Sequence, residues 1–88
     1  MSDKTSISPE QCRAARALLG WSREVLAERS RVGMATLADF EGGKRSPYER
    51  TLTDIRAALE DAGVEFIPSN GAGDGVRFRK ARRRGGKR

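Results

Sequence analysis

The sequence contains no histidine and only one cysteine, Cys12, among its 88 residues. A Ser–His–Asp triad, a Cys–His pair and a zinc site of cysteines and histidines all need residues that are missing here. A lone cysteine also excludes a disulfide within the chain, which favours a reducing compartment such as the cytoplasm. We therefore expect no enzyme, no metal site and no cofactor.

Long apolar segments are missing as well. No run approaches the ~18 apolar residues that a membrane-spanning helix needs, and the first residues, MSDKTSISPE, lack the apolar centre of a signal peptide. Hydrophobic residues make up 36% of the chain and the mean hydropathy is −0.67. This composition is enough for one small, compact and mainly helical domain with no membrane partner.

Positive charge is concentrated at one end. Residues 1–76 hold ten Lys and Arg against all twelve acids, whereas residues 77–88 hold eight Lys and Arg and no acid, so a body of −2 and a tail of +8 give the net +6. A block of like charge does not pack on itself, so we expect a disordered tail over 80–88. Such a tail suits a polyanion, and a solubilising role is the plainer alternative.

Four helices are predicted from caps and apolar spacing. Ser8 and Gln11 form a capping box around Pro9, and Gly20 ends this first helix, in which Cys12 is a small buried residue. Ser22 caps a second helix over 23–29, a third runs over 34–41, and a fourth begins at Thr51 and ends at Gly63.

Two β-favouring runs follow, 64–67 and 76–79, separated by the turn-forming PSNGAGDG, which indicates a hairpin. The chain is thus divided into a flexible N-terminus (1–7), a helical domain (8–63), a hairpin segment (64–79) and the basic tail (80–88).

The second and third helices have the features of a helix-turn-helix unit, whose second helix enters the major groove of DNA. Ala27 is the small residue that two closely crossing helices need, and Val32 can anchor the turn. Leu37 and Phe40 bury one side of the third helix and leave its other side free.

The run GWSREVLAERSRVGMATLADFEGGKRSP resembles the Xre-type, lambda-repressor-like helix-turn-helix family of bacterial and phage repressors, over about residues 8–62. More narrowly, the EFIP segment that follows the helices is similar to that of short alphaproteobacterial members. The fold class that the resemblance implies is a mainly α, four-helix DNA-binding domain, here with a C-terminal β-hairpin and a basic tail.

Residue roles follow from the resemblance. It implies a partly buried ion pair of Arg16 with Glu41. It also implies contacts with double-stranded DNA at the start of the second helix, on the third helix and in the loop after it. The residues at those places are Ser22, Arg23, Met34, Ala35, Thr36, Asp39, Lys44 and Arg45. Arg31, in the turn, is expected to contact DNA for a different reason, because the residues that face the groove discriminate weakly between bases. The tail residues Arg82, Arg83 and Arg84 would follow phosphates or enter the minor groove.

Three positions depart from the family pattern. Arg23 stands where Gln is common, Arg31 replaces the turn glycine, and Gly33 replaces the serine that caps the third helix. Arg31 is therefore expected to adopt a positive φ. Met34, Ala35 and Thr36 suit thymine methyls rather than guanine or adenine edges, while Asp39 suits a cytosine amino group.

A single unit of this size binds DNA weakly, so we expect a homodimer that pairs through an exposed strand edge. The residues of that edge are Val64, Phe66, Val76 and Phe78. The alternative is a hairpin that folds back on its own helices.

These observations predict a sequence-specific DNA-binding regulator, a dimeric repressor that inserts the helix 34–41 in the major groove and is associated with the nucleoid. Two alternatives have the same fold: the antitoxin of a toxin–antitoxin pair, and an anti-activator that binds a protein through this fold without DNA. An RNA-binding role lacks an aromatic platform for bases.

Overall fold

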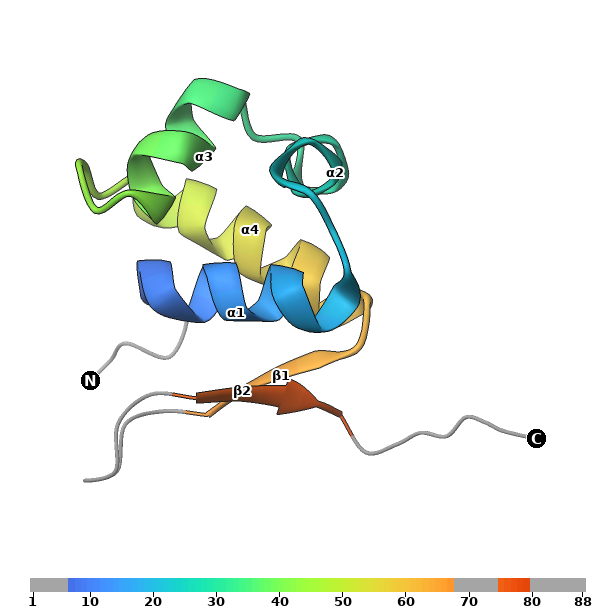
Figure 1. The fold of residues 1–88 in the computed structure, drawn as a ribbon. Coiled ribbons are helices and arrows are strands. Elements are labelled where there is room, and N and C mark those ends of the chain that lie inside the picture. The colour runs from blue at the N-terminus through green and yellow to red at the C-terminus, as the bar shows by residue number, and fades with distance from the viewer. Residues whose placement is uncertain (1–6, 68–74, 80–88) are drawn as a thin grey trace.

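The computed structural model describes residues 7–67 and 75–79. Within them the chain forms α1 (Pro9–Leu19), α2 (Arg23–Ser30), α3 (Met34–Glu41), α4 (Glu49–Asp61), β1 (Val64–Ile67) and β2 (Gly75–Phe78). Figure 1 shows three levels: α3 with α2 at the top, α1 and α4 below them, and the β-hairpin at the bottom. The expected fold class, four helices followed by a hairpin, is confirmed.

The first helix begins and ends at the predicted residues, and the second begins at the predicted residue, because their caps form as expected. The second helix runs one residue further than predicted, to Ser30. In α1, the Gln11 amide donates to Ser8 Oγ and the Ser8 amide donates to Gln11 Oε1, both at 3.0 Å. Gly20 ends this helix in the left-handed region. In α2, the Val25 amide donates to Ser22 Oγ at 3.2 Å.

The fourth helix begins at Glu49, two residues before the predicted start at Thr51, and that prediction is wrong. Tyr48 is its N-cap residue and makes no side-chain capping bond. Tyr48 and Glu49 are both exposed, so water can satisfy the free amides of this turn, and Glu49 places a negative charge at the positive end of the helix. A hydroxyl cap is therefore not needed here.

The core lies where the four helices meet. Leu26, Leu37, Ile55 and Leu59 are completely buried, one or two from each of α2, α3 and α4. Cys12 of α1 is also completely buried, as predicted. Two smaller core residues lie where α2 meets the turn before α3. They are Ala27 of α2 and Val32 of the turn, and each is 8% exposed.

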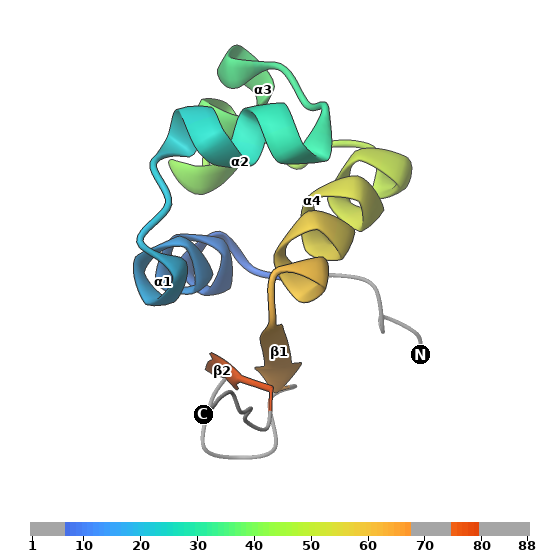
Figure 2. The ribbon, with the colours of Figure 1, turned by 90° about the vertical axis from the view of Figure 1, so that its right-hand side faces the viewer.

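The hairpin is antiparallel, with Val64 opposite Phe78 and Phe66 opposite Val76. It packs beneath α1 and α4, as the side view shows (Figure 2). The Gln11 side chain fastens it, because Nε2 donates to the carbonyl oxygens of Ile67 and Gly75 at 3.3 and 2.9 Å.

This packing corrects the expectation of an exposed pairing surface. Val64 is completely buried and Phe66 is only 8% exposed, so their side chains face the chain's own helices and are not available to a partner. Val76 is half-buried against the same core, while Phe78 stays 54% exposed. The two-stranded sheet thus gains its stability from the helices of the same chain, which is the alternative stated above.

Arg31 adopts φ 62° and ψ 33°, so a non-glycine residue does occupy the left-handed turn after α2. Among the described residues it is the only non-glycine residue with a positive φ. Its side chain is exposed, so glycine at this position would remove no buried packing.

We predict that Arg31→Gly is neutral or raises the unfolding free energy by up to about 1 kcal/mol, because it removes the strain of the left-handed conformation. Thermal unfolding measures the effect. Gly20→Ala, at φ 70°, is the matched control and should lower the melting temperature. A clear fall for Arg31→Gly would show that its side chain stabilises the turn.

Candidate DNA interface

The exposed side of α3 follows from its buried side. Leu37, Phe40 and Glu41 lie three and four residues apart and are all buried, which fixes how the helix is rotated. Met34, Ala35 and Thr36 are exposed as a consequence, with Met34 at 41%. Among the described residues, nothing covers this helix face, so it is open to another molecule.

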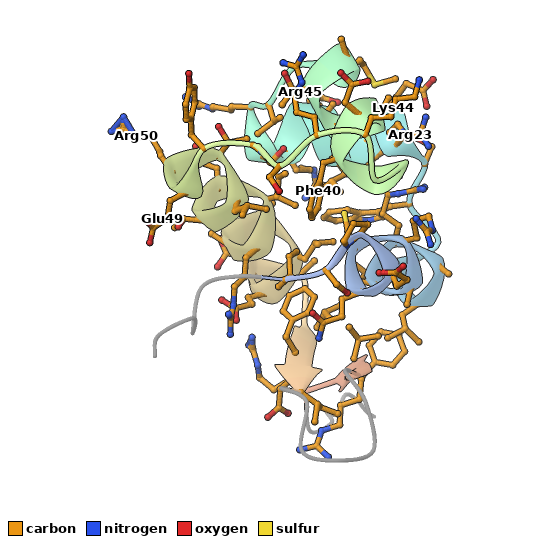
Figure 3. All side chains as sticks on the ribbon, turned by 90° about the vertical axis from the view of Figure 1, so that its left-hand side faces the viewer. Arg23, Phe40, Lys44, Arg45, Glu49 and Arg50 are labelled. Atoms are coloured by element: carbon orange, nitrogen blue, oxygen red, sulfur yellow. The ribbon has the colours of Figure 1, made fainter. Side chains whose placement is uncertain are left out.

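Basic side chains surround this face. Arg23 comes from the start of α2, and Lys44 and Arg45 come from the loop after α3; all three lie at the end of the molecule that carries α3 (Figure 3). Arg31 is exposed in the turn between α2 and α3. Arg23, Lys44 and Arg45 thus lie at the same end of the molecule, and Arg31 lies in the turn at the start of α3.

Asp39 does not stand alone on this surface. Its Oδ2 lies 4.0 Å from Arg45 Nε, and the two side chains are 39% and 71% exposed. A pair this exposed contributes little to stability. It does place a carboxylate acceptor beside a guanidinium donor at the C-terminal end of the exposed helix face.

A second group of charges lies beneath the helix. Glu41, at the end of α3, is 1% exposed, and its carboxylate accepts two hydrogen bonds from Arg16, each at 2.8 Å. Arg23 Nε donates to the same carboxylate at 3.1 Å, and so does Cys12 Sγ at 3.1 Å. We call these four residues the Glu41 cluster; they join α1, α2 and α3.

This arrangement agrees with the comparison of the chain with protein families. Residues 13–60, more than half of the sequence, match the model of a family described as Helix-turn-helix. The chain belongs to this family. It is the Xre-type, lambda-repressor-like helix-turn-helix, so the protein is a DNA-binding transcription regulator. No curated protein matches the sequence.

The matched span includes the whole α2–α3 helix-turn-helix and the Glu41 cluster from Arg16 onward, and it ends within α4 before the hairpin. None of the helices in the described part of the chain is long and apolar enough to cross a membrane. Nor do the described residues hold a group of three or more side chains suited to a metal ion.

The pKa values of the Glu41 cluster show why the charge can remain buried. Burial alone would raise the pKa of Glu41, but hydrogen bonds from Arg16, Cys12 and Arg23 outweigh it and hold that pKa below its ordinary value. The stabilisation is therefore complete above the ordinary pKa of glutamate and is lost as the pH falls through the lowered one.

The pKa values of Cys12 and Arg16 are shifted in the opposite direction from that of Glu41. Burial, followed by the hydrogen bond to Glu41, raises the pKa of the Cys12 thiol, and the hydrogen bond to Glu41 raises the pKa of Arg16. Cys12 thus stays a neutral thiol donor, and Arg16 stays a cation. The predicted ion pair of Arg16 with Glu41 is present, and it is bidentate.

Arg23 links the cluster to the surface of the helix-turn-helix. Its Nε is held by Glu41, yet its side chain is 39% exposed. A guanidinium has five N–H donors, so Arg23 can keep the bond to Glu41 and donate to a phosphate at the same time. The sequence predicted the phosphate contact but not the bond to Glu41, because no local spacing connects positions 23 and 41.

Ser22 caps α2, as the sequence predicted. Its Oγ accepts the bond that caps α2, which leaves its hydroxyl proton to donate elsewhere. The tail residues Arg82, Arg83 and Arg84 lie outside the described residues.

Tyr48 is a surface residue that the sequence did not single out. It is 86% exposed and lines a shallow hollow between α3 and the start of α4, together with Thr36, Arg45, Ser46, Pro47 and Thr51. The sequence could have identified Tyr48 as a candidate, because it is a large aromatic residue directly after a proline in a loop. Its position next to Thr36 and Arg45 adds it to the candidate DNA-binding residues.

The hydrogen bonds of the Glu41 cluster predict which arginine contributes more to the free energy of unfolding. Arg16→Ala should lower the unfolding free energy by about 3 kcal/mol or more, because the buried carboxylate loses its bidentate partner. Arg23→Ala should cost about 1 kcal/mol or less, because this partly exposed arginine makes only one bond to the carboxylate.

Urea unfolding measures both values, and Arg45→Ala, at a largely exposed pair, is the control without effect. If Arg16→Ala and Arg23→Ala lowered the unfolding free energy equally, Arg16 would not be the main partner of Glu41.

Proposed function

We propose that the protein is a sequence-specific transcriptional repressor that inserts α3 in the major groove of an operator. The observation that supports this most directly is the exposed face of Met34, Ala35 and Thr36. Arg23, Lys44 and Arg45 lie at the end of the molecule that carries α3 (Figure 3), and Arg31 is exposed in the turn before this helix. An α-helix fits the major groove, and flanking cations at the helix ends match the phosphates on either side. By occupying the operator, the protein would exclude other DNA-binding proteins.

Base recognition on this face depends on van der Waals contacts of methyl groups and on one carboxylate. The methyl groups of Met34, Ala35 and Thr36 pack against thymine methyls, and Asp39, oriented by Arg45, accepts from a cytosine amino group. Lys44 and Arg45 provide affinity through phosphates and little discrimination. The exposed cations around this face favour DNA over the alternative in which the same surface binds a protein partner.

We predict that selection from a random pool of duplexes gives a palindromic consensus with half-sites about 34–36 Å apart, or a multiple of this spacing. Thr36→Ala should relax the preferred base at one position of each half-site. Lys44→Ala should weaken binding to all sequences alike and reduce the salt slope by about 0.9 for each phosphate that the protein no longer neutralises.

Arg77→Ala is the matched control for Lys44→Ala, since Arg77 is an exposed cation of β2, and β2 lies at the opposite end of the molecule from α3 (Figure 1). It should leave binding to a single short duplex unchanged. Recovery of random sequences from the pool would contradict the proposal.

The palindrome requires a dimer, and the proposed contact is the hairpin. Phe78 supports this assignment because it is 54% exposed although it lies on the sheet face that also carries Val64 and Phe66. Covering a phenylalanine this exposed with a second chain removes apolar surface from water, which stabilises the dimer. In the described part of the chain the two strands pair only with each other, so each strand has one edge that no further strand covers.

Phe78→Ser is predicted to shift the monomer–dimer equilibrium toward monomer and to weaken operator binding, with little change in the melting temperature of the monomer. Analytical ultracentrifugation measures the equilibrium. Leu18→Gln, at a residue of α1 that is 38% exposed, is the control expected to leave the dimer unchanged. Loss of dimer in the control alone would move the interface from the hairpin to α1.

A further inference from the structure

A hollow lies between α3 and the start of α4, directly beside the helix face that is proposed to enter the major groove. It encloses about 400 Å³. Thr36 of α3 belongs both to this hollow and to the exposed helix face. The loop before α4 and the first turn of α4 contribute the other five lining residues, which are Arg45, Ser46, Pro47, Tyr48 and Thr51. We call these six residues the Tyr48 hollow.

The lining of the Tyr48 hollow suits an anion. Arg45 is 71% exposed, and its Nε lies 4.0 Å from Asp39. A guanidinium has five N–H donors, so Arg45 can face Asp39 and donate to a phosphate as well. The hydroxyls of the lining serine and threonines are further donors. None of the six lining residues is acidic, and Glu49, which follows Tyr48, lies apart from Arg45 at the side of α4 (Figure 3).

Tyr48 gives the hollow an apolar wall, next to the half-buried Pro47. Tyr48 is 86% exposed, more than any other large hydrophobic residue in the described part of the chain. Its flat ring removes much apolar surface from water when a partner covers it, and its hydroxyl can hydrogen-bond at the same time. Tyrosine is for this reason enriched among the residues that contribute most to binding.

Tyr48 also occupies a position that favours a different type of residue. It is the N-cap of α4, where Ser, Thr, Asp and Asn are preferred because their side chains accept a backbone hydrogen bond. Tyr48 makes no such bond. A residue that departs from a local preference without a gain inside the chain is expected at a functional site. The exposed ring therefore points to a partner outside the chain.

We infer that the Tyr48 hollow binds one deoxyribose-phosphate unit of the operator backbone. The Tyr48 ring packs against the C–H groups of the deoxyribose, while Arg45 and the neighbouring hydroxyls donate to its phosphate. A free small molecule fits less well, because pockets for such ligands surround them, whereas Tyr48 is almost fully exposed. A contact with sugar and phosphate identifies no base, so it sets the register of α3 in the groove. This inference rests on the proposed operator binding.

A salt titration of operator binding separates the ring from the charge. Tyr48→Ala should weaken binding by about tenfold, because tyrosines buried at interfaces contribute strongly to affinity. The salt slope should stay unchanged, since the ring neutralises no phosphate. Arg45→Ala, in contrast, should weaken binding and also reduce the slope by about 0.9 for each phosphate that it no longer neutralises.

Two further variants at the same position separate binding from folding. Tyr48→Phe keeps the ring and should bind the operator like the original chain. Tyr48→Ser removes the ring but can accept a hydrogen bond from the Thr51 amide at the start of α4. It should therefore bind as weakly as Tyr48→Ala while its melting temperature equals or exceeds that of the original chain. Thr53→Ala, at an exposed residue of α4 outside the hollow, is the control expected to change neither quantity.

Three results would overturn the inference while operator binding stands. Unchanged affinity in Tyr48→Ala would show that the hollow does not touch the DNA. A reduced salt slope in Tyr48→Ala would mean that Tyr48 acts by positioning Arg45. Binding of Tyr48→Phe as weak as that of Tyr48→Ala would assign the contact to the hydroxyl. If the original chain itself shows no preference for the selected operator over scrambled duplexes, the proposed function fails as well.

Discussion

The position of α3, the helix proposed to read DNA, depends on one buried carboxylate. Glu41 ends α3, and its four hydrogen bonds connect that helix to Arg16 and Cys12 of α1 and to Arg23 at the start of α2. A charge in this location is costly unless its partners are all in place, so the folded state holds the three helices in one arrangement. Since Leu37 and Phe40 fix the rotation of α3 at the same time, the exposed side of the helix is set by the core and by the cluster together.

This arrangement separates stability from recognition. The residues that fix α3 are buried, while Met34, Ala35 and Thr36 are exposed and can change without disturbing the core. Arg23 is the exception, because it belongs to the cluster and also reaches the surface. The proposed contact of Arg23 with a phosphate would therefore be coupled to the position of α3.

Much of the fold and part of the site were predictable from the residues themselves. Ser8 with Gln11, Ser22 and Gly20 determine where α1 and α2 begin or end, because caps act over three or four residues of the chain. Arg31 at positive φ was predictable because it stands where the family has its turn glycine. The start of α4 was not, since a solvated helix end needs no particular side chain and Thr51 offered a misleading cap. The exposure of Tyr48 depends on how the loop after α3 lies.

By itself, the sequence determined the helices, the hairpin, the family and the concentration of positive charge after residue 76, all of which follow from local spacing and composition. Only the tertiary structure decided that Val64 and Phe66 belong to the core, that Arg23 binds Glu41, and that β2 ends on the side away from α3. The physical reason is that these facts relate residues from different elements. Periodicity shows which face of an element is apolar, whereas packing decides what covers that face and where the chain leaves it.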